Sequence, residues 1–419
     1  MQEIKKIITG KTAKTGYWAI IDQAIVSISN FFVAFFLARN ISQYEFGIFS
    51  LGYAIMIFVN SIQYSIITSP MMVLSAPLEG QNKQAYFSSL AILQVYLGLI
   101  LTIIMLSIGI LFNNFMIGKM IIVMSLIIFM YMGQEYIRRN LFAVLENSKA
   151  LLNDFICYGT QMIGIVILFK FNKLSWESAF LTIGITSGIA LLFGLYQIKG
   201  IWNMQSLDLR NVAKKNWIYG KWLLASNLAT YTSSQAYLFI SALMLGPSAS
   251  GALRAVQNVF GPTHIFLSGF TNFVPQIATN RYISGGFSKL KEFLGKMAFV
   301  LVALIAFYGI IICSMPEYIL NLFYKDRYAG YGYLLIIFAI SYIVNTISLV
   351  LNYGLRVIQK TRVIFNAYIG SSIITAFVSI PLIHYLKLEG AVIGILLAGL
   401  FVLFYSYMGM KLFSKEMTR

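Results

Sequence analysis

Charged residues are scarce in this chain: Asp, Glu, Lys and Arg together account for 11% of its 419 residues. A soluble globular protein carries roughly 25% charged residues, so a chain this poor in charge has little water to face. Hydrophobic residues make up 59% of the sequence, and the mean hydropathy is +0.78. The composition therefore excludes an ordinary soluble domain and predicts a protein that lies within a lipid bilayer.

Cysteine and histidine are also rare, with 2 of each in the sequence. Cys157 and Cys313 lie in separate apolar runs, where we interpret them as small hydrophobic residues and expect neither a disulfide nor a metal site. The sequence also lacks a phosphate-binding glycine loop and an apparent catalytic set. We therefore expect no cofactor and no enzyme activity. Any transport is expected to be passive or driven by an ion gradient or a partner, rather than by ATP.

Long apolar runs fill most of the chain, and about 20 apolar residues suffice for one membrane-spanning helix. We predict an all-α integral membrane protein with about 12 transmembrane helices and no soluble domain between them. The longest predicted loops are 199–216 and 277–292. The predicted segments are 17–39, 46–68, 88–112, 115–135, 150–170, 178–198, 217–245, 251–276, 293–315, 329–352, 363–383 and 390–411.

The distribution of positive charge predicts the orientation in the membrane. The net charge is +17, from 31 Lys and Arg against 14 Asp and Glu. With this helix count, 23 of the 31 basic residues fall in the termini or in loops on the terminal side, and 8 fall on the other side. Cytoplasmic loops are enriched in Lys and Arg, so we predict that both termini are cytoplasmic. We expect no nucleic-acid partner, because the basic residues lie in short gaps between apolar runs rather than on a polar surface.

The two halves of the chain align without gaps at an offset of 204 residues. We predict two domains, 1–205 and 206–419, each a six-helix bundle. An even number of helices separates the copies, so the repeats insert in the same direction, as in transporters built from two parallel bundles. Chance similarity between apolar sequences is the alternative. The identical pairs are Gly16 with Gly220, Trp18 with Trp222, Ala38 with Ala242 and Gly47 with Gly251.

Polar residues inside apolar segments are the first candidates for function, because each is costly in lipid unless it faces protein or water. Asp22 in the first segment either lines a cavity, where it binds a cation, a proton or a sugar hydroxyl, or is hydrated near the interface or paired with a lysine. We take it as a candidate for ion coupling. Asn30 and Gln235 lie in the middle of the first and seventh segments. Such amides either join helices or line a cavity, and we take both as candidate substrate-binding residues.

Charged residues also gather where the fourth segment ends and the fifth begins. Glu135, Arg138 and Arg139 share a helix face through i, i+3 and i+4 spacing, and Asp154 opens the next helix. Either these residues form an ion-pair cluster that ties a helical hairpin, or Arg139 provides a guanidinium fork for a pyrophosphate. Arg254, near the outer start of the eighth segment, either anchors a helix end or adds to a positive lining. We take Arg139 and Arg254 as candidate substrate-binding residues and Asp154 as a second candidate for ion coupling or cavity lining.

The chain carries three motifs in this order: LARNISQYEFG at 37–47; Arg139 followed by Ala143, Asn147 and Asp154; and Ile380-Pro381 followed by LEGAVIG at 388–394. Together they resemble those of the polysaccharide repeat-unit flippases, which translocate O-antigen or capsule units within the multidrug/oligosaccharidyl-lipid/polysaccharide exporter superfamily. The Gly-Lys-Thr that this family places before its eleventh helix reads Gln359-Lys360-Thr361 here.

The resemblance implies two six-helix bundles around a central cavity that opens alternately to the two sides of the bacterial inner (cytoplasmic) membrane. It implies a substrate of oligosaccharide linked to undecaprenyl pyrophosphate, moved to the outer leaflet for O-antigen or capsule biosynthesis. Membrane lipids are expected partners, and H⁺ or Na⁺ and the polysaccharide polymerase machinery are further candidates. By the same resemblance, Asp22, Arg139, Asp154 and Arg254 are expected to line the cavity.

Three alternatives stay open. A cation-coupled multidrug antiporter of the same superfamily should centre on buried acidic residues, whereas here arginines rival the acids and favour an anion. A membrane-embedded sugar polymerase or ligase should display a large outer loop with catalytic Arg or His, and the predicted outer loops are short. A purely structural membrane subunit is the third alternative.

Overall fold

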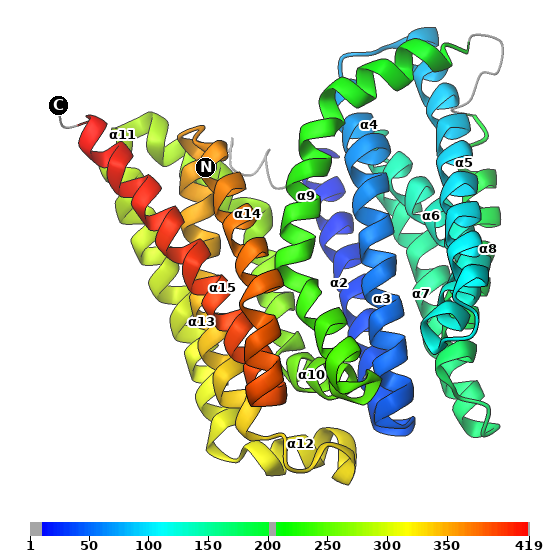
Figure 1. Ribbon diagram of the computed structural model, residues 1–419. Coiled ribbons are helices and arrows are strands. Elements are labelled where there is room, and N and C mark those ends of the chain that lie inside the picture. Colours follow the sequence, from blue (N-terminus) through cyan, green and yellow to red (C-terminus); the bar gives the residue numbers. More distant parts are fainter. Residues whose placement is uncertain (1–10, 201–206, 418–419) are drawn as a thin grey trace. The chain divides into compact units, whose positions relative to one another are not determined.

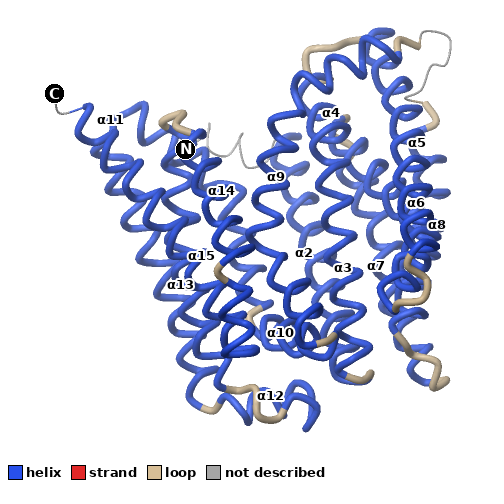
Figure 2. The backbone as a smooth tube through the Cα atoms, viewed as in Figure 1, coloured by secondary structure: helices blue, strands red, loops and turns tan. Residues whose placement is uncertain are grey.

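The computed structural model describes residues 11–200 and 207–417, and helices run through most of these two ranges, which contain no strand (Figure 2). Figure 1 shows the order of the helices along the chain. The first elements are α2 (Lys11–Asn40), α3 (Gln43–Gln63), the π-helix η1 (Tyr64–Thr68), α4 (Ser69–Leu74), α5 (Gly80–Leu111), α6 (Met116–Ala143), α7 (Asn147–Lys170) and α8 (Trp176–Ile198). They are followed by α9 (Leu209–Leu245), α10 (Pro247–Val259), α11 (Gly261–Ser314), α12 (Pro316–Tyr324), the 3₁₀-helix η2 (Lys325–Tyr328), α13 (Tyr333–Val357), α14 (Thr361–Phe377) and α15 (Ser379–Met417).

Each predicted apolar segment corresponds to helix, which confirms the all-α prediction. Within the described ranges, 9 helical stretches are long and apolar enough to cross a membrane. The other predicted segments correspond to helices that are shorter or more polar. Of these, α10 has 13 residues, α14 has 17, and α9 begins with a basic stretch around Arg210 and Lys214.

The connection predicted at 277–292 is much shorter than expected, because helical residues extend into it from both sides. The two helical parts of α11 meet at Gly285 and Gly286, where Gly286 has a φ of 66°, a conformation that a residue without a Cβ adopts easily. A second interruption lies in α15 at Lys387, whose φ is 50°. Polar residues at a membrane surface lower the hydropathy without breaking a helix, so the helices extend beyond the apolar runs.

The chain divides into two compact units, which are described separately. The first takes its described residues from Met1–Phe36 and Gly52–Asn227, and the second from Leu37–Leu51 and Leu228–Arg419. The chain therefore passes from one unit to the other inside α2, α3 and α9. The domain boundary predicted between residues 205 and 206 lies outside the described residues.

Each unit has its own apolar core. In the first, Leu90, Ile137 and Ile198 bring α5, α6 and α8 together. In the second, Leu294 and Leu355 lie in the core shared by α11, α13 and α15. The outer helices carry exposed apolar side chains: in α5 these include Ile100, Ile103 and Leu111, which is 75% exposed. Such residues are suited to a lipid environment, as expected for a membrane protein.

Glycines allow close approach between helices, which matters in lipid because packing rather than water exclusion drives helix association. In the first unit a Cβ on Gly184 of α8 would overlap the side chain of Ile127 of α6. In the second unit a Cβ on Gly47 of α3 would overlap the carbonyl oxygen of Pro247 and come 3.2 Å from the backbone nitrogen of Gly251. Gly47 and Gly251 are one of the pairs matched in the repeat alignment, so equivalent positions of the two repeats meet here.

Candidate functional site

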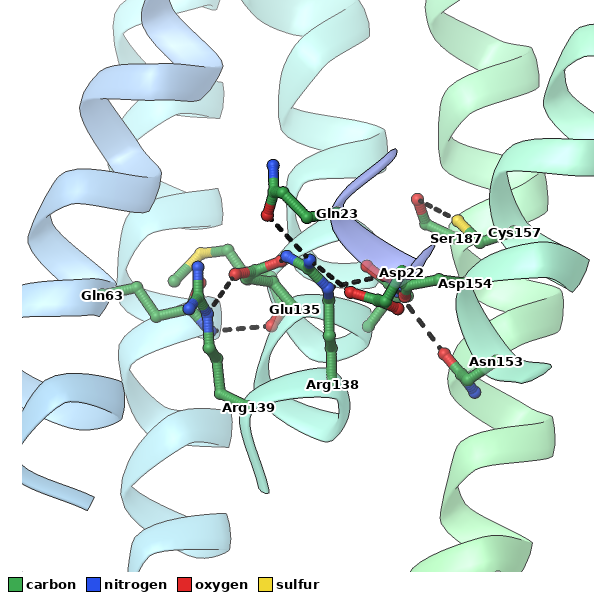
Figure 3. Close-up of polar contacts among 12 residues, drawn as sticks. Asp22, Gln23, Gln63, Glu135, Arg138, Arg139, Asn153, Asp154, Cys157 and Ser187 are labelled. Carbon is green, nitrogen blue, oxygen red and sulfur yellow. Dashed lines mark hydrogen bonds and ion pairs between the residues drawn. The ribbon is translucent and has the colours of Figure 1, made fainter. Parts of the chain in front are cut away.

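A buried ion cluster joins three helices of the first unit (Figure 3). Arg138 of α6 lies at its centre, with its Nη2 atom 2.7 Å from Asp22 Oδ2 on α2. Its Nε atom lies 2.5 Å from Asp154 Oδ2 on α7. The side chains of both aspartates are 0% exposed and that of Arg138 is 6% exposed. One guanidinium therefore holds α2, α6 and α7 together.

Glu135 extends the cluster along α6. Its carboxylate accepts a hydrogen bond from Arg139 Nε at 2.7 Å and lies 3.5 Å from Arg138 Nη1. The i, i+3 and i+4 spacing of these residues on one helix makes both contacts possible. Gln134 donates to Asp154 Oδ1 at 2.8 Å, which fixes the second oxygen of that carboxylate. The ion pairs predicted as one of two interpretations are present, and Arg139, at 29% side-chain exposure, forms the accessible edge of the cluster.

Asp22 is deeper in its helix than the sequence indicated. Because α2 already includes Lys11, Asp22 lies about 16 Å along the helix from that residue at 1.5 Å per residue. Its partner is an arginine rather than a lysine. The other oxygen of the carboxylate, Oδ1, is buried without a hydrogen-bond partner among the described residues.

The charges within this cluster do not balance. Asp22, Glu135 and Asp154 bring three carboxylates, whereas Arg138 and Arg139 bring two guanidinium groups. An unbalanced charge inside a membrane protein is costly, since the low dielectric weakens screening. Chemically, the arrangement can lower this cost by holding one proton or one monovalent cation.

A second polar cluster lies in the second unit, where Arg254 and Gln235 contact each other. Arg254 Nη2 donates to Gln235 Oε1 on α9 at 2.8 Å, and Arg254 Nη1 donates to Gln257 Oε1, one turn along α10, at 2.9 Å. The hydroxyl of Tyr237 donates to the same oxygen of Gln257 at 2.9 Å. The structure thus brings together two of the predicted substrate-binding residues.

Arg254 differs from Arg138 in the charge of its partners. Both of its hydrogen-bond acceptors are neutral amides, and no carboxylate of the described residues lies within ion-pair distance. Its Nε atom is buried and has no hydrogen-bond partner in the same residues. Arg254 therefore keeps an uncompensated positive charge on a half-buried side chain.

Asn30 and Arg39 lie outside the two polar clusters. Asn30 is half-buried in the first unit, and no hydrogen bond from its amide to another described residue is recorded. Arg39 lies in the second unit, where it donates to the carbonyl oxygens of Leu322 and Phe323 at 3.2 Å each. These carbonyls end α12, where a helix has unpaired acceptors, so Arg39 caps a helix there.

Sequence reasoning chose Arg139 and missed the central position of Arg138. It also missed Gln134 and Gln257, each of which binds a charged residue of the two clusters. The available signal was the run of i, i+3 and i+4 charges. That signal places Arg138 and Arg139 about 100° apart on α6 but does not say which one faces α2.

Fold comparison shows that the chain has the fold of several solved membrane transporters. A multidrug resistance transporter of the MATE family, in the MOP superfamily and an inward-facing conformation, superposes with a TM-score of 0.75 at 13% identity, covering 93% of this chain and 95% of the other. The lipid II flippase MurJ, in an inward closed conformation, gives a TM-score of 0.69 at 15% identity, covering 93% and 87%. An outward-facing MATE transporter gives 0.58 at 13% identity, covering 97% and 96%. The chain is a multi-pass membrane protein with the fold of this superfamily.

A family match covers part of the chain. Residues 224–382, most of the second unit, match the MatE family. Comparison with curated protein sequences gives no significant match. The structural matches therefore support the predicted fold, and the family match concerns part of the second half of the chain.

Proposed function

We propose that this protein flips an anionic, lipid-linked oligosaccharide across the bacterial cytoplasmic membrane by alternating access. The proposed substrate is a repeat unit carried on undecaprenyl pyrophosphate, for O-antigen or capsule synthesis. In this proposal both termini are cytoplasmic, and the polysaccharide polymerase machinery receives the product. The head group is large, polar and charged, so crossing hydrocarbon without a protein is prohibitively costly.

The observation that carries the proposal is the uncompensated charge of Arg254. Its contact Gln235 lies about 15 Å from the end of α9 at Leu245, counted at 1.5 Å per residue, so the guanidinium is far from that helix end. A half-buried arginine without a carboxylate partner is costly inside a membrane protein, and charged residues there mark substrate or ion pathways. A cation whose partners are two amides is suited to an anionic ligand, because a phosphate oxygen would supply the missing negative charge.

The ion cluster of the first unit is the proposed coupling site. Asp22 and Asp154 share one guanidinium, and the cluster carries one carboxylate more than its two arginines neutralise. Uptake and release of a proton or Na⁺ there would change the charge that holds α2, α6 and α7 together. Arg139 and Asn30 are proposed to contact substrate from the same unit.

A second candidate function is a cation-coupled multidrug antiporter. The excess of buried carboxylates in the first unit favours it, because such an antiporter needs acidic groups that bind a cation or a cationic drug. The two candidates differ in the charge of the substrate, so transport of an anionic and of a cationic compound separates them.

The test uses the purified protein in proteoliposomes with two compounds, an undecaprenyl-pyrophosphate-linked oligosaccharide and the lipophilic cation tetraphenylphosphonium. The wild type should move the oligosaccharide lipid between leaflets. Arg254→Gln should slow this roughly tenfold or more, because a charge-assisted hydrogen bond contributes about 1.5–3 kcal/mol. Arg362→Gln, on an exposed residue, is the matched control and should not change the rate. Gradient-driven movement of tetraphenylphosphonium without movement of the oligosaccharide would contradict the proposal and favour the antiporter.

A further inference from the structure

The ring of Tyr64 and the guanidinium of Arg139 form a partly exposed pair in the first unit. The Cζ atom of Arg139 lies 5.8 Å from the centre of the Tyr64 ring, within the range of a cation–π contact. Tyr64 is 37% exposed, and the Arg139 side chain is 29% exposed. The pair thus lies at the accessible edge of the ion cluster.

Arg139 is fixed through one end of its guanidinium only. Its Nε donates to Glu135, and no hydrogen bond from its Nη atoms to another described residue is recorded. Arginine has five N–H donors, and lipid offers no acceptor for those that stay free in the hydrocarbon region. The Nη edge therefore needs water or a ligand that accepts hydrogen bonds. The cluster as a whole carries one carboxylate more than its two guanidinium groups, so the case for a ligand at this edge rests on the free donors of Arg139 and not on net charge.

The π-helix η1 places Tyr64 at this edge. π-Helical turns are rare in proteins, and those that occur are often found at functional sites. Here α9 contacts the turn at three positions. Asn216 donates to the carbonyl oxygen of Ile66 at 3.1 Å, and Asn227 donates to Ser65 Oγ at 2.9 Å. Gly220 lies between them, and a Cβ there would overlap the carbonyl oxygen of Ser65.

These contacts restrain the backbone of the turn that carries the Tyr64 ring. Residues 216, 220 and 227 are spaced by four and seven, so they share one face of α9. This face of α9 restrains the backbone of the π-helix η1, and Tyr64 is the first residue of η1. An aromatic ring that is held in place and partly exposed can contact a ligand with little loss of conformational entropy.

We propose that Tyr64 and Arg139 together bind the sugar-phosphate junction of the substrate. The free Nη edge takes a phosphate oxygen, since a guanidinium fork matches phosphate geometry. The Tyr64 ring packs against the C–H face of the first sugar, because the negative face of the ring attracts the slightly positive hydrogens of that surface. The assignment rests on the proposed function, and it adds Tyr64 as the residue that recognises the sugar.

The experiment compares two probes with the protein in lipid nanodiscs: undecaprenyl pyrophosphate, and the same lipid carrying one N-acetylhexosamine. Tyr64→Leu should weaken binding of the sugar-bearing probe by roughly twofold to tenfold, the equivalent of an aromatic contact, and leave the bare pyrophosphate unchanged. Tyr64→Phe keeps the ring and should bind both probes as the wild type does. Arg139→Gln should weaken both probes by about tenfold or more, because both carry the phosphate.

Tyr96→Leu is the matched control, since Tyr96 is an exposed tyrosine on α5 at 54% exposure. It should leave both affinities unchanged. A merely structural role for Tyr64 would alter both probes together, so the difference between the probes is the decisive readout. Equal binding of the sugar-bearing probe by Tyr64→Leu and the wild type would overturn this inference alone. Failure of the wild type to bind either probe would overturn it together with the proposed function.

Discussion

Replacing Arg138 by glutamine removes the guanidinium that contacts Asp22, Asp154 and Glu135. The cluster then keeps three carboxylates and one guanidinium, that of Arg139, whose ion pair is with Glu135. The contacts of Arg138 are almost fully buried, with side-chain exposures of 0–6%, so water screens little of the resulting repulsion. Removing one partner of a buried ion pair costs about 3–5 kcal/mol, and we expect Arg138→Gln to lower the free energy of unfolding by that amount.

Reversible unfolding in mixed micelles measures this free energy directly. Two further variants separate charge from packing. Arg138→Gln combined with Asp154→Asn should regain about 1–3 kcal/mol of the loss, because one unpaired carboxylate is removed with the guanidinium. Lys296→Gln removes an ion pair to Glu292 whose side chains are 76% and 63% exposed, and it should not measurably change stability.

A free energy of unfolding for Arg138→Gln within about 0.5 kcal/mol of the wild-type value, the range of an ordinary surface substitution, would contradict this role of Arg138. So would a double variant that is less stable than Arg138→Gln by the full cost of a second buried substitution. Either result would mean that Arg138 does not neutralise the two aspartates in the folded protein.

Three further predictions concern packing and topology. Gly47→Ala should destabilise the protein by about 1–3 kcal/mol in the same unfolding assay, because its Cβ would overlap a carbonyl of α10, whereas Gly159→Ala, with nothing within 4 Å, should be neutral or slightly stabilising. Asn216→Leu should cost about 1–3 kcal/mol, since it leaves a carbonyl of η1 without its 3.1 Å donor; wild-type stability would remove Asn216 from that role. Reporter fusions near Ser206 and Ser284 should both report cytoplasm, and a periplasmic signal at either position would break the predicted topology.

The helices could be predicted from the sequence because their physical cause is local. A run of apolar residues in lipid must satisfy its own backbone hydrogen bonds, and a helix is the form that does so. The helix ends follow a different rule. Polar residues such as Lys289 and Lys291 continue α11 outside the apolar run, because leaving lipid does not break a helix. The break occurs instead at Gly285 and Gly286, where the backbone adopts conformations outside the helical range.

The polar clusters could be predicted only in part. The spacing of Glu135, Arg138 and Arg139 on one helix indicated their ion pairs, since that spacing is local. The contact between Arg138 and Asp22 joins residues 116 positions apart. It depends on how α6 is rotated toward α2, and a single sequence does not encode that rotation in any local pattern. For the same reason the pairing of Arg254 with Gln235, on separate helices, became visible only in the structure.

The transported head group is proposed to be anionic, and one comparison of transport rates tests this most directly. In proteoliposomes, the initial transport rate of an oligosaccharide on undecaprenyl pyrophosphate is compared with that of the same oligosaccharide on an uncharged undecaprenyl ether. Losing the charge-assisted contacts of Arg254 should slow the neutral compound by roughly tenfold or more, and Arg254→Gln should reduce the difference between the two rates to the share that Arg139 contributes. Equal rates for the two compounds in the wild type would contradict an anion-binding passage.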